Sequence, residues 1–367
     1  MRPSDRRALS VQLLIYLVVA GLVAAAGLFA IATLRSRGIA AGFGFLWNTA
    51  GFDIGFKLIA FDATSTYGRA FLVALLNTLL VSVLAIMLAT LIGLLVAVMR
   101  LQPVPTLRAA GTIYVEAVRN TPMLLQLLAL YFLVLGALPP PRQSLTIGGA
   151  VLINNRGLFL PAPLGDHIAV GLGTAALGLG VAAWRLRRNR KGIGVAYALG
   201  LAALGLAIAA ALRIQWDLPA LRGLAVRGGI AVVPELVVLV TALSVYTAAF
   251  IAETFRSGFL SVAKGQWEGA AALGLDRQRA LHLVVLPQAL RACLPPLANQ
   301  YVNVVKASSL AAAVGFPDLM QVFGKTTLNQ TGQAVEVIAL TMAVYLAISM
   351  AIAATFQIYA NRGWGSH

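Results

Sequence analysis

Cysteine and histidine are almost absent from this chain of 367 residues, and their scarcity excludes several kinds of chemistry. Cys293 is the single cysteine and lies in an apolar stretch, so the chain can form neither an intramolecular disulfide nor a thiolate cluster. The three histidines, His167, His282 and His367, are scattered without metal-binding spacing. We therefore predict no metal site and no cofactor in this chain, and we expect no catalysis by the chain itself.

Charged residues are also scarce. They make up 11% of the sequence, whereas soluble domains contain roughly 25%, and hydrophobic residues make up 60%. An ordinary soluble domain is therefore excluded. The net charge of +16 would suit a nucleic-acid-binding protein, but in so apolar a chain we attribute it to the excess of Lys and Arg that membrane proteins carry on their cytoplasmic side.

Long apolar runs predict an all-α integral membrane protein with about eight transmembrane helices, because roughly 20 apolar residues span a bilayer. The first run follows a basic N-terminus and is too long for the core of a signal peptide. The seventh contains Pro295 and Pro296 as well as several amide side chains, so we expect a broken, polar span there. The runs cover approximately 11–34, 69–98, 113–138, 168–184, 194–212, 231–255, 292–310 and 334–359.

The distribution of Lys and Arg orients these spans. With both termini inside, sixteen basic residues lie in inside segments and nine in outside segments. The basic cluster from Arg185 to Lys191, between the fourth and fifth runs, then lies inside. This orientation predicts cytoplasmic termini and places the polar stretch 265–287 in the cytoplasm.

That stretch, GQWEGAAALGLDRQRALHLVVLP, interrupts otherwise apolar sequence. Its small residues predict a short helix with one smooth face that another protein can approach closely, beside the charge of Glu268. A turn is expected at Gly274, and Pro287 is expected to end or kink the helix that follows. From residue types alone, an ordinary cytoplasmic loop helix explains the stretch equally well.

The same residues resemble the EAA loop of ABC importer permeases. The match consists of Glu268, Ala270, Ala271 and Gly274, with Pro287 thirteen residues after the glycine. Gly269 departs from the family pattern, which usually has Ala there, and costs about 1 kcal/mol of helix propensity. The resemblance implies that this loop forms the coupling helix that docks into a groove of the ATP-hydrolysing subunit.

A second motif narrows the resemblance to ABC permeases for polar amino acids. It consists of Glu116, Arg119, Thr121, Pro122 and Gln126, and the segment from Tyr246 to Gly258 supports the same group. By residue type alone, Thr121-Pro122 is a favourable helix start, and Glu116 and Arg119 are close enough on one helical face to pair. A capped helix entry with a surface ion pair would explain these residues too.

Polar side chains inside membrane spans are costly and usually face a bundle interior or a water-filled path. Asn77 and Glu253 belong to this class, and hydrogen bonds between helices are an equally good explanation for any one of them. The concentration around the seventh span favours a substrate pathway. The predicted pathway residues are Gln126, Thr247, Asn299, Asn303 and Lys306.

The predicted organisation is a core of five helices with additions. Residues 1–68 form an N-terminal transmembrane helix and a periplasmic segment, 69–359 form the permease domain with an inserted hairpin at about 167–212, and 360–367 form a cytoplasmic tail. This enlarged layout resembles the longer permease subunit of general L-amino-acid importers in the inner membrane of Gram-negative bacteria.

The resemblance implies a function and a set of partners. The chain would form the translocation path of an ATP-driven importer for polar or general L-amino acids, in the membrane lipid of the bacterial inner membrane. Two ATPase subunits that bind ATP and Mg²⁺, a second and different permease, and a periplasmic amino-acid-binding protein would be its partners. An ion-coupled secondary transporter is the alternative, although it would require membrane-embedded acids and internal repeats. A structural scaffold is a further alternative that leaves the polar seventh span unexplained.

Overall fold

The computed structural model describes residues 42–164, 167–187, 193–213, 215–222 and 225–362, together with scattered positions between 14 and 29. The chain divides into two compact units. The first comprises Met1–Leu130 and Val238–His367, and the second comprises Tyr131–Val237. The predicted first span and the tip of the predicted basic cluster lie largely outside the described residues.

Long helices form the frame of the first unit. Among the described residues, four helical stretches are long and apolar enough to cross a membrane, and a bent pair makes a fifth. They are α2 (Tyr67–Leu101), α7 (Pro234–Leu260), the stretch around α10 (Leu286–Ala307) and α13 (Ala334–Arg362), with α3 (Pro105–Arg119) and α4 (Met123–Ala137) as the pair. The prediction of about eight spans is tested only for this part of the chain.

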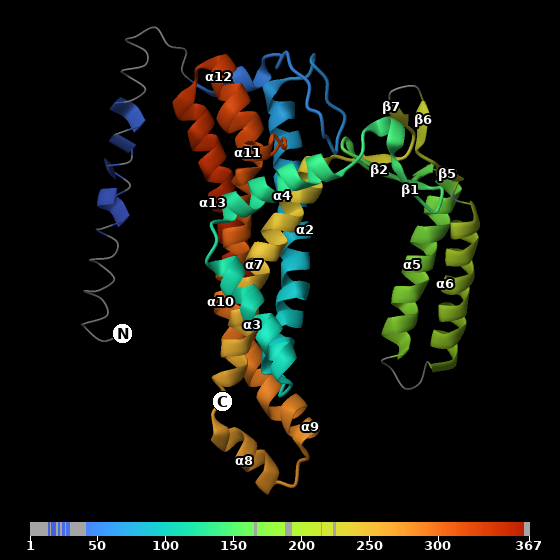
Figure 1. Cartoon of the computed structure of the whole chain (residues 1–367), viewed down its shortest axis with the longest axis vertical. Helices are drawn as coiled ribbons and strands as arrows, with labels where there is room; N and C mark the ends of the chain where they lie inside the picture. Colours follow the sequence, from blue (N-terminus) through green and yellow to red (C-terminus); the bar gives the residue numbers. More distant parts are fainter. Residues whose placement is uncertain are drawn as a thin grey trace. The chain divides into compact units, whose positions relative to one another are not determined.

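Short elements lie at the two ends of this bundle, as Figure 1 shows. At one end are α8 (Lys264–Ala272), α9 (Arg277–Ala280) and the π-helical turn η4 (Leu281–Val285). At the other end the 3-10 turn η1 (Phe43–Trp47) precedes α2, and the connection between α10 and α13 contains η5 (Ser308–Leu310), α11 (Ala311–Val314), the π-helix η6 (Met320–Thr327) and α12 (Leu328–Thr331).

Two expected spans differ from the structure. The third was expected to be one helix, but α3 and α4 meet at 101°, because Pro122 lacks a backbone donor and disfavours helical geometry at Thr121. The seventh was expected to be broken, yet α10 runs continuously with Pro295 and Pro296 inside it. The fixed φ of proline is close to the helical value, so the loss of two donors need not end a helix whose other bonds persist.

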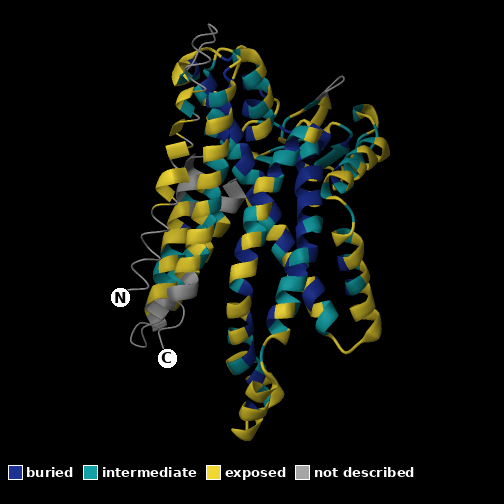
Figure 2. Ribbon diagram, turned by 90° about the vertical axis from the view of Figure 1, so that its left-hand side faces the viewer, coloured by how far each residue is buried: buried dark blue, intermediate teal, exposed yellow. Residues whose placement is uncertain are grey.

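A close approach between α2 and α7 is made possible by Gly93. A Cβ atom built there would lie 2.7 Å from Ile251 Cγ2 and 3.0 Å from the Ala248 carbonyl oxygen. The backbone of α2 therefore lies directly against the Ile251 side chain of α7. Small residues allow such close contacts between helices in membrane proteins. Figure 2 shows buried residues along the inner faces of these helices.

We expect Gly93→Leu to weaken the packing of α2 on α7, with a loss of roughly 3 kcal/mol, because overpacking forces the backbone to move. The thermal midpoint of the purified protein measures this. Gly136→Leu is the matched control, since a Cβ at Gly136 in α4 meets nothing within 4 Å. Equal midpoints for the two variants would contradict the close approach.

The segment before α2 packs on the connection between α10 and α13. Phe45, Phe61 and Tyr67 share one buried cluster with Leu319 and Phe323. Asn77, fully buried in α2, donates from Nδ2 to the carbonyl oxygens of Phe56 and Pro317, each at 2.9 Å. Asn77 therefore ties the segment before α2 and the connection between α10 and α13 to α2, which is the structural alternative for a polar residue in a span.

Asp318 is a buried acid in this connection. Its Oδ1 accepts a hydrogen bond from the Gln321 backbone at 2.8 Å, and Tyr345 donates to Oδ2 at 3.2 Å. Burial outweighs these hydrogen bonds and raises the pKa of Asp318 from 3.8 to about 6. In the unfolded chain the carboxyl ionises near its ordinary pKa, so the folded state loses stability as the pH rises from about 4 to 6.

Asp318→Asn should remove that loss of stability, because the amide cannot ionise and keeps an acceptor for Gln321. At pH values above 6 the variant should therefore have a higher thermal midpoint than the wild type. The pKa difference corresponds to on the order of 3 kcal/mol. Melting curves between pH 4.5 and 7.5 measure the effect, with wild type and variant converging at the acid end. Asp53→Asn, at an exposed site in the segment before α2, is the control and should show no such gain; a gain equal to that of Asp318→Asn would contradict the interpretation.

The second unit contains β-structure, which the prediction of an all-α protein missed. Strands β1 (Leu145–Ile147), β2 (Val151–Asn154), β3 (Gly157–Leu160) and β8 (Ile230–Val232) form an antiparallel sheet in that order. β4 (Ala162–Leu164) pairs with β5 (Gln215–Asp217), and β6 (Ala220–Arg222) pairs with β7 (Ala225–Arg227). Strands of three or four residues are too short to show a period in the sequence.

A helical hairpin of α5 (His167–Arg187) and α6 (Ile193–Arg213) is inserted between β4 and β5. It coincides with the hairpin predicted at about 167–212. The turn from β1 to β2 uses Gly148 and Gly149 at φ values of 61° and 70°, a left-handed geometry that favours glycine in tight hairpins. The 3-10 turn η2 (Pro141–Gln143) precedes the sheet.

Candidate functional site

The predicted coupling loop folds as an exposed helix at one end of the bundle. In α8, Glu268, Gly269 and Ala271 are exposed, whereas Ala270 is 3% exposed. Ala270 therefore packs within the loop, and the smooth face expected from the small residues is narrower than predicted. Figure 2 shows this tip of the molecule largely in the colour of exposed residues.

Gly274 ends α8 as the turn prediction required. Its φ is 76°, its backbone N–H donates to the Ala271 carbonyl at 2.9 Å, and that of Leu275 donates to the Ala270 carbonyl at 3.1 Å. This pair of hydrogen bonds is the Schellman ending, which places a left-handed residue just after the helix. Leu273, the last residue before it, is 82% exposed.

The rest of the loop holds α8 against the spans. Asp276 caps α9 by accepting from the Arg279 N–H at 2.8 Å, and Gln288 donates to Gln266 across the loop at 3.0 Å. Pro287 lies in the first turn of α10, directly after η4. The helical stretch nevertheless runs on from Arg277 to Val314, so Pro287 does not end the helix. The π-helical turn η4 directly before Pro287 is the local irregularity in this stretch.

A cavity of about 310 Å³ lies inside the first unit. Thr247 and Asn303, two of the predicted pathway residues, line it. The full lining is Met123, Tyr246, Thr247, Phe250, Gln300, Asn303 and Ala307. None of these side chains is charged, and the combination of aromatic rings with a few convergent polar groups is typical of small-molecule sites.

Three predicted pathway residues do not line this cavity. Asn299 and Lys306 are exposed on α10. Gln126 donates from Nε2 to the carbonyl oxygens of Val118 and Thr121, at 2.9 and 3.0 Å. It therefore binds two backbone carbonyl groups at the bend between α3 and α4. Gln300, which was not among the predicted residues, does line the cavity.

The motif before α4 is arranged differently from the expected ion pair. In the described part of the chain Glu116 and Arg119 do not pair. Instead the Arg119 guanidinium lies 5.1 Å from the centroid of the Phe250 ring, a cation–π contact. Phe250 also packs against Tyr246, with ring centroids 5.1 Å apart. Arg119 thus supports an aromatic wall of the cavity, and Thr121-Pro122 forms the bend beside it.

A charge cluster joins α2 and α7 near the predicted coupling loop. Glu253 accepts from Arg100 through Oε2, and Arg256 Nη2 donates to its Oε1 at 2.6 Å. The Arg100 and Glu253 side chains are 13% and 28% exposed. The sequence identified Glu253 only as a polar residue in a span, because its partner Arg100 lies 153 residues away.

The model of the family described as "Binding-protein-dependent transport system inner membrane component" matches residues 89–364. The chain belongs to this family. The resemblance inferred from the motifs is thereby confirmed, and the chain is a membrane permease component.

Three curated relatives can be aligned with nearly the whole length of this chain. The chain is 45% identical to the putative amino-acid ABC transporter permease protein YhdX of Escherichia coli K12, covering 97% of this chain and 94% of the relative. It is 40% identical to the general L-amino acid transport system permease protein AapQ of Rhizobium johnstonii, covering 94% and 89%. The glutamate/glutamine/aspartate/asparagine permease BztB of Rhodobacter capsulatus is 35% identical, with 96% and 92% covered.

Proposed function

We propose that this chain is the permease subunit of an ATP-driven importer for L-amino acids. The observation that carries the proposal is the exposed α8, closed by Gly274 and presenting Glu268 at the tip of a transmembrane bundle. The names of the relatives, which include transporters of general and of acidic and amide amino acids, support the substrate class.

The cavity provides the substrate site in this proposal. Thr247, Gln300 and Asn303 can hydrogen-bond the ammonium and carboxylate groups that all L-amino acids share. The uncharged lining selects neither an acidic nor a basic side chain, which suits a transporter of many amino acids. Phe250 and Tyr246 provide apolar surface for the rest of the substrate.

Transport requires partners that supply energy and substrate. We expect two ATPase subunits to dock on coupling helices and to hydrolyse ATP with Mg²⁺, so that hydrolysis belongs to the partners. A second, different permease would complete the path, and a periplasmic binding protein would deliver the amino acid. Closure of the ATPases would push α8, and the push would reach the cavity through α7 and α10, which flank the loop.

The orientation follows from the same proposal. ATP is cytoplasmic, so α8 lies in the cytoplasm of the bacterial cell and the connection between α10 and α13 lies in the periplasm. Both termini are then cytoplasmic. The excess of Lys and Arg in the inside segments supports this orientation.

Purification of the tagged chain from its native cells in mild detergent tests the proposal. We expect an ATPase and a second permease to be recovered with it, and ATP hydrolysis by the complex to rise when a binding protein loaded with an L-amino acid is added. A chain that is recovered alone and transports amino acids without ATP would overturn the proposal in favour of a secondary transporter.

A further inference from the structure

Two arginines mark the ends of the apolar part of α2. Arg69 and Arg100 are separated by 30 residues without a charged side chain. At 1.5 Å per residue they lie about 46 Å apart along the helix, close to the roughly 40–45 Å thickness of a bilayer with its headgroups. Arg100 contacts Glu253 near the coupling loop, so Arg69 lies at headgroup level on the opposite side of the membrane.

A large hollow lies beside Arg69. Its volume is about 1020 Å³, and both apolar and polar residues line it. Trp47, Phe71 and Leu72 are among the apolar residues, and Trp47 is 83% exposed. Tryptophan is enriched where membrane and water meet. Asp62 and Arg69 contribute charges to the lining.

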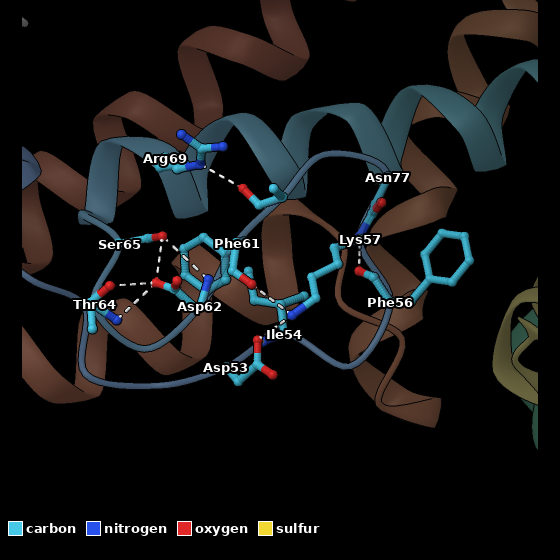
Figure 3. A network of polar contacts seen from close by, with 11 residues as sticks. Asp53, Ile54, Phe56, Lys57, Phe61, Asp62, Thr64, Ser65, Arg69 and Asn77 are labelled. Carbon is cyan, nitrogen blue, oxygen red and sulfur yellow. Dashed lines mark hydrogen bonds and ion pairs between the residues drawn. The ribbon is translucent and has the colours of Figure 1, made fainter. Parts of the chain in front are cut away.

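The two charges are held in place by hydrogen bonds that leave part of each group free (Figure 3). Arg69 donates from Nε to the Ala60 carbonyl at 2.6 Å, and its terminal nitrogens meet no acceptor among the described residues. Asp62 Oδ1 accepts from the Thr64 hydroxyl at 2.7 Å and the Ser65 hydroxyl at 3.0 Å, whereas no described donor meets Oδ2. The hydrogen bond from Thr64 lowers the pKa of Asp62, so the carboxyl is ionised at neutral pH.

Lys57 contributes little further charge to the hollow. Its ammonium group pairs with Asp53 at 2.7 Å and donates to the Phe61 carbonyl at 2.6 Å. The hollow therefore presents one incompletely satisfied cation and one incompletely satisfied anion. Such a pair suits a ligand that is itself dipolar.

We propose that this hollow binds the headgroup of an amine-bearing phospholipid. The phosphate would pair with the Arg69 guanidinium, the ammonium group would pair with Asp62, and an acyl chain would lie along Phe71 and Leu72. Such a lipid fixes the segment before α2 to the membrane. The proposal requires only that α2 spans the bilayer, and it is independent of the transported substrate.

The apolar residues of the lining favour a lipid over a free amino acid with the same two charges. Leu72 is 50% exposed, and exposed apolar residues continue along α2 through Met87 and Leu91, at 58% and 64%. Leu72 therefore belongs to the bilayer-facing side of the helix in this chain. A small soluble zwitterion would leave these apolar residues uncovered.

The proposal is tested on the full chain together with any subunits that it retains. The protein is equilibrated with equal amounts of phosphatidylethanolamine and phosphatidylglycerol, and native mass spectrometry then measures which lipid stays bound. We expect one retained phosphatidylethanolamine per chain. Arg69→Gln should reduce retention of both lipids at least tenfold, and Asp62→Asn should abolish only the preference for the amine. Arg142→Gln, which removes an exposed arginine distant in sequence from the hollow, is the matched control and should retain the lipid.

The Arg69 variant also loses a hydrogen bond to the backbone, so its thermal midpoint must be measured as well. Leu72→Glu alters only an exposed side chain and should reduce retention without unfolding the protein. Equal retention in wild type, Arg69→Gln and Leu72→Glu would overturn the proposal. Displacement of the lipid by millimolar free amino acid would overturn it too, and would identify the hollow as a site for soluble zwitterions. Lipid retention is measured without transport, so the result does not depend on whether the chain supports ATP-dependent uptake.

Discussion

Replacing Glu268 with Lys is expected to abolish ATP-dependent uptake of L-amino acids while the protein still inserts into the membrane. Glu268 is exposed on α8 and makes no ion pair within the described residues, so reversing its charge should not disturb the fold. Reversal of a charge at a protein interface costs several kcal/mol, and each 1.4 kcal/mol corresponds to about a tenfold change in affinity. We therefore expect uptake to fall by more than about 100-fold.

Uptake by membrane vesicles supplied with ATP, together with recovery of the ATPase on the tagged chain, measures this effect. Gln278→Lys is the matched control, because it adds a positive charge at an exposed position of the same loop outside α8. It should retain most of the uptake. If Glu268→Lys took up amino acids as well as the wild type does, the assignment of α8 as the coupling helix would be wrong.

Replacing Glu253 with Ala is expected to destabilise the protein and to abolish uptake as a consequence. The change leaves Arg100 and Arg256 facing each other without the carboxylate that both contact. Removing one partner of a fully buried ion pair costs roughly 3–5 kcal/mol. We expect about 3 kcal/mol here, because the Glu253 side chain is still 28% exposed.

The thermal midpoint of the purified chain measures the loss. Glu116→Ala, which truncates an exposed glutamate of α3, should change stability by less than about 0.5 kcal/mol. Adding Arg100→Leu to Glu253→Ala should recover part of the loss, because the uncompensated cation is then removed. Additive losses in the double variant would show that the contact between Arg100 and Glu253 does not stabilise the bundle.

Local sequence patterns were sufficient wherever a feature depends on neighbouring residues. The apolar runs predicted α2 and α13 nearly to their ends, because a membrane helix is specified by its own hydrophobic length. Gly274 ends α8 as expected, since its left-handed geometry is a property of that residue and the turn around it. The order of the motifs was also enough to identify the family.

Features that depend on distant residues needed the tertiary structure. Gln126 matched the sequence motif and was predicted to line the pathway, but its amide is satisfied by backbone groups at the bend after α3. Gln300 lines the cavity and Asn299 does not, because neighbouring positions on a helix face different directions. The short strands of the second unit are stabilised by pairing with residues up to 74 positions away, as Leu158 with Val232 shows.

The sequence by itself therefore determined that the chain crosses a membrane, where its main helices lie and that α8 ends at Gly274. These properties follow from hydrophobic length and local turn chemistry. Only the tertiary structure decided which polar side chains share a cavity, which charges pair and how Arg69 and Asp62 come to line one hollow. Those properties depend on contacts between helices and connections that are far apart in the chain, and a linear pattern does not encode which of them meet.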